Sequence, residues 1–179
     1  MCQSKNTHRS LRYIGGYKTL INSLNIVTKL QQNRRYDLNN NVNHISRCSV
    51  WQWSLTIYNA VFLGLPVYKI KDNTTLHVLF QGNIYLGSCS GCCKRWFITF
   101  NGAECSGPLP IDAILWIRNS NTDDHRHGSI DGYCDNIRKG NIRVGINIGN
   151  CPGYGNSDGY TGYKSVSRLI IEEVPRSQQ

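Results

Sequence analysis

The sequence predicts an all-β fold, a two-layer antiparallel sandwich or jelly roll that follows a poorly ordered or short-helical N-terminal arm. Three observations support this prediction. From Cys48 onward, apolar and polar residues alternate in short runs, as expected for half-buried strands. The 17 glycines, with asparagine and proline, punctuate these runs as turn residues do. No helical crossover separates the runs, which disfavours a parallel sheet.

The apolar runs predict individual strands. Residues 76–80 and 84–86 flank the dipeptide Gln81-Gly82, which indicates a hairpin. Further strands are expected at 95–100, 111–117, 141–150 and 166–174. Alternation places the following residues on inward faces: Trp96, Ile98, Phe100, Ile111, Ala113, Leu115, Ile117, Ile142, Val144, Ile146, Ile148, Leu169 and Ile171.

The chain is expected to divide into a basic N-terminal arm, residues 1–47, and a sandwich domain, residues 48–176. Apolar residues recur at roughly helical spacing over residues 18–33, so a short helix is one expectation and a disordered segment is the other. The arm carries eight Lys or Arg and one acid, Asp37, whereas the remaining residues are nearly balanced in charge. The formal net charge of +9 therefore belongs mainly to the arm.

The basic residues 1–47 would attract polyanions, and the sequence favours one class of polyanion over another. No base-reading or RNA-stacking motif accompanies the charge, so nucleic acid is not an expected partner. Heparan sulfate is the expected polyanion. No apolar run reaches the ~20 residues that a membrane-spanning helix needs. The first residues lack a continuous apolar segment, so no signal peptide is recognised.

Six of the eight cysteines are clustered, and three interpretations compete. Cys89-x-x-Cys92 is half of a zinc signature that Cys105, His125 or His127 would complete. Cys105 with either histidine would suit nucleophilic catalysis, but nothing else marks such a site, and no enzyme or cofactor is expected. The even count in a small β domain favours disulfides, with fifteen possible connectivities. The candidates for disulfides are Cys89, Cys92, Cys93, Cys105, Cys134 and Cys151.

Disulfides favour an oxidising compartment, with which the lack of a recognised signal peptide conflicts, and one further feature agrees with secretion. Asn73-Thr74-Thr75 is a sequon in a polar turn, so Asn73 is the candidate glycosylation site. The states of Cys2 and Cys48, which lie outside the cluster, are left open. Exposed aromatic residues in the glycine-rich segment 151–164, namely Tyr154, Tyr160 and Tyr163, are candidates for surface contacts, with packing against the sandwich edge as the alternative.

Four segments together resemble one known family. They are "LHVLFQGNIYL", "CCKRWFITFNGAECSGPLPIDAI", "IDGYC" and "GYKSVSRLIIEEVP", between Leu76 and Pro175. They resemble the C-terminal globular domain of the collagen triple-helix repeat-containing family, which are secreted matrix glycoproteins. The resemblance implies a homotrimeric domain like those of complement C1q and tumour necrosis factor. It also implies association with Wnt–Frizzled complexes at the cell surface, a role in cell migration and collagen deposition, and no catalysis.

The chain departs from the family at its beginning. No signal peptide or collagen stretch is recognised, and residues 1–47 have no counterpart. A partial gene model with a foreign N-terminal piece would explain both departures, and a divergent short form is the rival explanation. An intracellular zinc-binding β module is the alternative function, since it needs no signal peptide.

Overall fold

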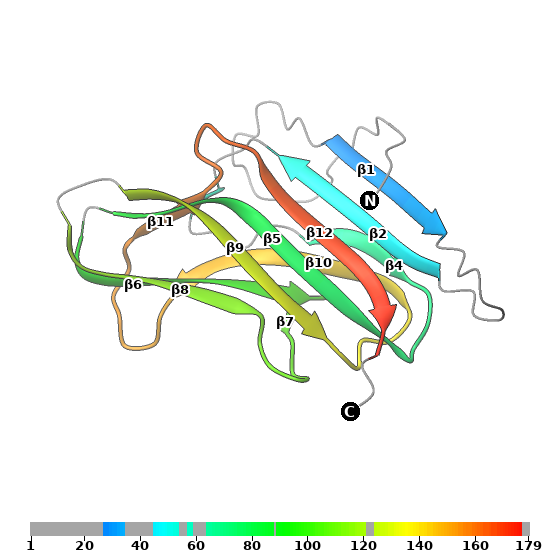
Figure 1. The fold of residues 1–179 in the computed structure, drawn as a ribbon. Helices are drawn as coiled ribbons and strands as arrows, with labels where there is room; N and C mark the ends of the chain where they lie inside the picture. The colour runs from blue at the N-terminus through cyan, green and yellow to red at the C-terminus, as the bar shows by residue number, and fades with distance from the viewer. Residues whose placement is uncertain are drawn as a thin grey trace, which may run out of the picture.

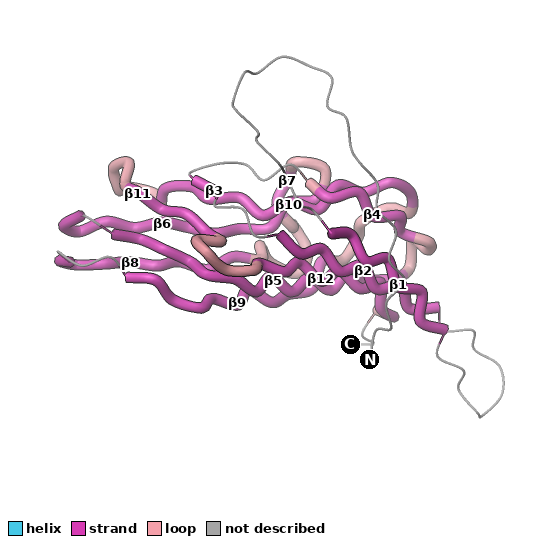
Figure 2. Tube along the Cα trace, turned by 90° about the horizontal axis from the view of Figure 1, so that it is seen from above, coloured by secondary structure: helices cyan, strands magenta, loops and turns pink. Residues whose placement is uncertain are grey.

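The computed structural model describes residues 27–34, 45–53, 57–58, 64–87, 89–120 and 124–176. These residues form twelve strands and no helix (Figure 2). The strands build two antiparallel sheets whose inward faces share one core. The all-β sandwich expected from the sequence is therefore confirmed.

The larger sheet, sheet A, has seven strands. Their order is β1-β2-β12-β5-β11-β3, and β9 pairs with β5 along the whole length of β9. Figure 1 shows β9, β5, β12, β2 and β1 side by side as one layer. The bounds are β1 (Val27–Arg34), β2 (Ile45–Trp53), β3 (Ile57–Tyr58), β5 (Thr74–Gly87), β9 (Asp124–Cys134), β11 (Asp158–Thr161) and β12 (Ser167–Pro175).

The smaller sheet, sheet B, has five strands and covers the inner face of sheet A. Its order is β4-β10-β6-β7, and β8 pairs with β6. The bounds are β4 (Leu65–Lys69), β6 (Cys89–Phe100), β7 (Ala103–Glu104), β8 (Asp112–Ser120) and β10 (Gly140–Asn150). Because β10 pairs with β6 in register, Ile146 lies opposite Ile98 in the middle of the sheet.

The core consists of the alternate residues that the sequence placed inward. Ten of the thirteen expected inward side chains are buried, and the other three, Ala113, Leu115 and Ile117 of β8, pack against the same cluster while partly exposed. Sheet A adds Leu76, Val78, Phe80 and Leu86 from β5. The two-residue period of the strands thus accounts for the burial of both inner faces.

The hairpin expected at Gln81-Gly82 is wrong. Strand β5 runs without interruption from Thr74 to Gly87. Gly82 is buried, and a Cβ atom there would lie 2.5 Å from the Oγ atom of Ser167 on β12. The glycine therefore allows close approach of two strands and does not form a turn.

The helix expected over residues 18–33 is wrong for residues 27–33, which belong to strand β1. Residues 18–26 lie outside the described residues. Strand β1 pairs with β2, which in turn pairs with β12. Pairing with the edge of sheet A therefore decides the conformation of these residues, and their weak helical spacing does not. Strand β2 also runs across the expected boundary between residues 47 and 48, and the division into arm and sandwich domain stays a prediction.

A buried ionic network joins the turn after β4 to the last strand. The carboxylate of Glu173 accepts hydrogen bonds from the backbone N–H groups of Ile70 (2.8 Å) and Lys71 (2.9 Å). The hydroxyl of Thr74 donates to Glu173 Oε1 at 2.6 Å and accepts from Lys69 Nζ at 2.9 Å. Lys69 is fully buried, and burial lowers the pKa of its ammonium while the nearby charge of Glu173 raises it.

Candidate functional site

All six clustered cysteines form disulfides. Cys89 bonds Cys92 within the start of β6, and Cys93 bonds Cys151 just after β10. Cys105, after β7, bonds Cys134 at the end of β9 and so ties a loop of sheet B to sheet A. Neighbouring Cys92 and Cys93 bond different partners, because successive side chains of a strand point to opposite faces.

The three disulfides differ in the loops that they close. Cys93–Cys151 and Cys105–Cys134 join residues 58 and 29 positions apart. On the loop-closure estimate each contributes about 4 kcal/mol to the free energy of unfolding. Cys89–Cys92 joins residues only 3 positions apart, and the same estimate gives about 2 kcal/mol. The first two are therefore the main structural crosslinks.

These disulfides remove the proposed metal ligands and nucleophile. The sulfurs of Cys89 and Cys92 bond each other, and Cys105, buried and bonded to Cys134, has no thiol to act as a nucleophile. His125 and His127 are exposed on β9. Within the described ranges, no group of three or more His, Cys, Asp or Glu side chains could hold a metal ion. The zinc and nucleophile interpretations based on these cysteines are therefore wrong.

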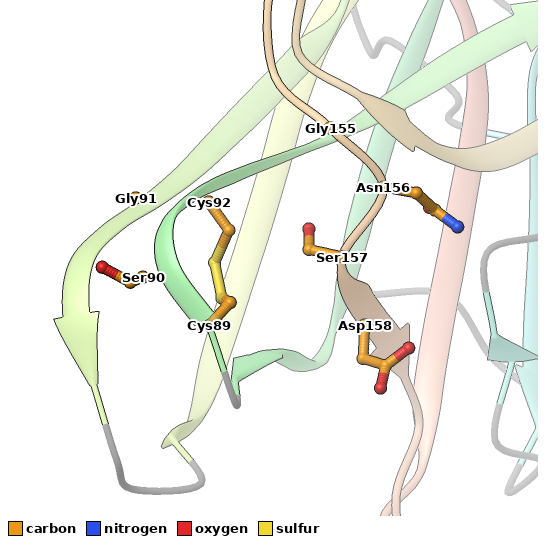
Figure 3. Close-up of a pocket in the computed structure, with 8 residues that line it drawn as sticks. All are labelled: Cys89, Ser90, Gly91, Cys92, Gly155, Asn156, Ser157 and Asp158. Atoms are coloured by element: carbon orange, nitrogen blue, oxygen red, sulfur yellow. A yellow bond between two sulfur atoms is a disulfide. The ribbon is translucent and has the colours of Figure 1, made fainter.

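One pocket adjoins the short disulfide. It has a volume of about 330 Å³ and lies between the start of β6 and the segment that leads into β11. Figure 3 shows the Cys89–Cys92 disulfide facing the Ser157 side of this segment across the pocket. The lining residues are Cys89, Ser90, Gly91, Cys92, Gly155, Asn156, Ser157 and Asp158.

Gly91 makes the short disulfide possible. Two extended residues separated by three positions would direct their side chains to opposite faces of the strand. Gly91 has a φ of 63°, a left-handed conformation that glycine adopts without a steric penalty. The chain therefore turns between Cys89 and Cys92, and a Cβ atom at Gly91 would meet no other atom within 4 Å.

A buried lysine holds the opposite wall of the pocket. Lys94 is only 1% exposed, and its ammonium donates hydrogen bonds to Asn150 Oδ1 (2.6 Å) and Asn156 Oδ1 (3.2 Å). Burial lowers the pKa of Lys94, and the carboxylate of Asp158 partly opposes this shift. The lysine thus connects the end of β10 to a residue that lines the pocket, while Cys93–Cys151 anchors the segment between them.

A second feature is an aromatic cluster on the outer face of sheet A. Tyr85 of β5 stacks on Tyr160 of β11 with ring centroids 4.2 Å apart, and His125 of β9 stacks on Tyr163 at 4.6 Å. Tyr160 is half-buried, whereas Tyr163 is 39% exposed. Tyr154 is exposed but does not join these ring pairs. The sequence therefore identified two members of the cluster, and strand pairing brings Tyr85 and His125 to them.

The outer face of sheet B carries exposed apolar side chains. Ile114 and Trp116 of β8 are 59% and 50% exposed, and Tyr68 of β4 is 55% exposed. Between these edges, the guanidinium of Arg95 binds both carboxylate oxygens of Glu104 and also contacts Asp112. The hydrogen bond to Glu104 is the main cause of the raised pKa of Arg95. Ile114 and Trp116 alternate with Ala113, Leu115 and Ile117, the residues of this strand that the sequence predicted to be inward.

The described residues define a class of protein, a disulfide-crosslinked β-sandwich of the kind found in oxidising compartments. No helix among them is long and apolar enough to cross a membrane. The family described as "CTHRC1, C-terminal domain" matches residues 39–171. The chain therefore belongs to the CTHRC1 family, whose members are secreted, matrix-associated and non-enzymatic.

Proposed function

We propose that this protein is a non-enzymatic module of the extracellular matrix that acts as a homotrimer on Wnt–Frizzled-type complexes and thereby regulates cell migration and collagen deposition. The observation that carries this proposal is the family match over residues 39–171. Two exposed apolar residues, Ile114 and Trp116, support association with a protein surface, because side chains of this type supply much of the contact energy at interfaces. A trimer would also present each weak binding site three times.

The trimer and the receptor contact are tested separately. Sedimentation velocity of the oxidised chain at micromolar concentration should give about three times the 20.3 kDa mass of one chain. Binding to an immobilised Frizzled-type extracellular domain is then measured with and without a Wnt protein. A monomer that binds neither the receptor domain nor its Wnt complex would contradict the proposal.

Matched variants show which sheet makes the receptor contact. Trp116→Ser alters the outer face of sheet B, and Tyr133→Ser alters the outer face of sheet A at a residue that is 53% exposed. We expect Trp116→Ser to weaken receptor binding about ten-fold or more and Tyr133→Ser to change it little. The reverse result would assign the contact to sheet A.

A second candidate function is binding of heparan sulfate through the basic N-terminal residues. Residues 1–47 carry eight basic side chains against one acid. Removing the whole segment would also remove β1 and part of β2, so charge substitutions are the better test. Retention on heparin should fall when Lys5, Arg9, Arg12 and Lys18 are all replaced by glutamine, and it should fall with rising salt in the native chain. Unchanged retention would exclude this segment as the binding site.

The glycosylation site also stays a proposal. Asn73 is exposed in the turn between β4 and β5, where an oligosaccharide would meet solvent. A glycan there would project from the same turn that Lys69 and Glu173 hold in place.

A further inference from the structure

The short disulfide differs from the other two in ways that concern reactivity. It closes the smallest loop, so its loss costs the fold least. Cys89 is partly exposed, whereas each of the other five clustered cysteines is buried. Cys89 and Cys92 both line the pocket, and the other four do not. A disulfide with a weak structural role and an accessible sulfur has the properties of an exchangeable one.

The charges around the pocket also suit exchange. Cys92 and Lys94 are alternate residues of β6 and both are buried, so their side chains leave the same face of the strand, and Lys94 donates a hydrogen bond to Asn156 in the pocket wall. A nearby cation stabilises a thiolate. Asp158 places a carboxylate at the pocket, and this negative charge disfavours the approach of an anionic thiol.

We propose that the Cys89–Cys92 disulfide is a thiol–disulfide exchange site for low-molecular-weight thiols that enter the pocket, with a preference for cationic over anionic thiols. The thiol first loses its proton to solvent, and its sulfur then attacks the Sγ atom of Cys89. A new S–S bond forms there while the Cys89–Cys92 bond breaks. Cys92 leaves with the electron pair as a thiolate, which takes up a proton from solvent. This step exchanges one disulfide for another without an external oxidant.

The product is a mixed disulfide at Cys89 and a free thiol at Cys92. A second molecule of the thiol can attack the small-molecule sulfur of the mixed disulfide. That step releases the symmetric small disulfide and the Cys89 thiolate, and the two thiols have then supplied the two electrons. The other two disulfides keep the sandwich crosslinked throughout.

The test uses the oxidised full chain after its free thiols have been blocked. Cysteamine, a cationic thiol, or glutathione, a net anion, is added, and the new thiols are trapped by alkylation and assigned by mass spectrometry. Cys92 should be alkylated, and the small-molecule adduct should lie on Cys89. We expect this disulfide to react about ten-fold or more faster than Cys93–Cys151 and Cys105–Cys134, which act as internal controls.

Two variants separate native-state exchange from unfolding. Asp158→Asn should speed the reaction with glutathione several-fold and slow the reaction with cysteamine, because the carboxylate repels the anion and attracts the cation. Cys89→Ser/Cys92→Ser should abolish the fast phase while the protein keeps a cooperative thermal transition. Loss of all three disulfides at one rate, or a rate that rises with low urea, would show that exchange requires unfolding and would overturn the proposal.

Discussion

The buried network around Glu173 supports a prediction about stability. Replacing Glu173 by glutamine keeps the size of the side chain and removes its charge. The fully buried ammonium of Lys69 would then lack its main neutralising partner. The two carboxylate oxygens accept hydrogen bonds from Ile70 N–H (Oε2) and Lys71 N–H (Oε1). In glutamine an NH₂ group replaces one of these oxygens, so one of the two backbone N–H groups would face a donor and lose its hydrogen bond.

Lys69 and Glu173 are linked through the hydroxyl of Thr74, and the charge of Asp72 also raises the pKa of Lys69. The expected loss is about 3 kcal/mol in the free energy of unfolding at neutral pH, the lower end for leaving a buried charge without its main partner. The double variant Lys69→Met/Glu173→Gln removes both charges, and it should recover much of this loss. The double-mutant cycle should therefore give a coupling energy of about 2 kcal/mol between the two residues.

The unfolding free energy lost in Glu173→Gln should depend on pH, and the titration of Lys69 determines whether the loss grows or shrinks as the pH rises. Burial lowers the pKa of Lys69 from its ordinary 10.5, so folding disfavours the ammonium, and the penalty is full at pH values below the folded pKa. Without the charge of Glu173 this pKa falls further. The difference in unfolding free energy between the native chain and Glu173→Gln should therefore be largest near neutral pH and shrink as the pH rises towards 10.5.

Urea unfolding followed by tryptophan fluorescence measures these differences, with all proteins kept oxidised. Glu172→Gln is the matched control, because Glu172 is adjacent in sequence but its side chain is 37% exposed and lies 3.3 Å from His77. We expect that control to lose less than about 1 kcal/mol. Equal losses for the two glutamates, or a loss for Glu173→Gln that does not change with pH, would refute the reasoning.

Four further predictions address the core, the pocket and the surface. Ile146→Ala should cost about 3 kcal/mol because Ile146 is buried opposite Ile98, whereas Ile114→Ala on the exposed face should cost about 0.5 kcal/mol or less; urea unfolding measures both. Lys94→Met removes an ammonium whose pKa is lowered by burial. The unfolding free energy of the native chain should therefore increase relative to that of Lys94→Met as the pH rises towards 10.5, as measured by urea unfolding of both proteins at each pH. Trp96→Phe should lower the unfolding free energy, measured by thermal unfolding, by about 1 kcal/mol or less. The smaller ring loses packing contacts, but the substitution also removes a buried Nε1 atom that has no hydrogen-bond partner, and this gain offsets part of the loss. Asn73→Gln should abolish the mass shift that a glycosidase produces in protein secreted from eukaryotic cells, and leave the melting temperature unchanged.

Much of the fold was predictable because strand periodicity is a local property. Trp96, Ile98 and Phe100 alternate with polar or half-buried neighbours, and both their strand and their inward face followed from that pattern. Gly82 shows where local reasoning failed. A Gln-Gly dipeptide favours a turn, but the tight contact with Ser167 comes from a strand 85 positions later in the chain.

The sequence by itself determined the fold class, the inward residues of most strands and the set of cysteines available for crosslinking, because alternation and composition depend only on the order and type of neighbouring residues. Only the tertiary structure decided which cysteines pair, since Cys105 and Cys134 become neighbours through two sheets and not through spacing. It also decided the setting of Lys94, a residue type that is seldom fully buried. Its ammonium is buried because Asn150 and Asn156, from one end of β10 and the segment beyond, close over it and supply the hydrogen bonds that water would otherwise make.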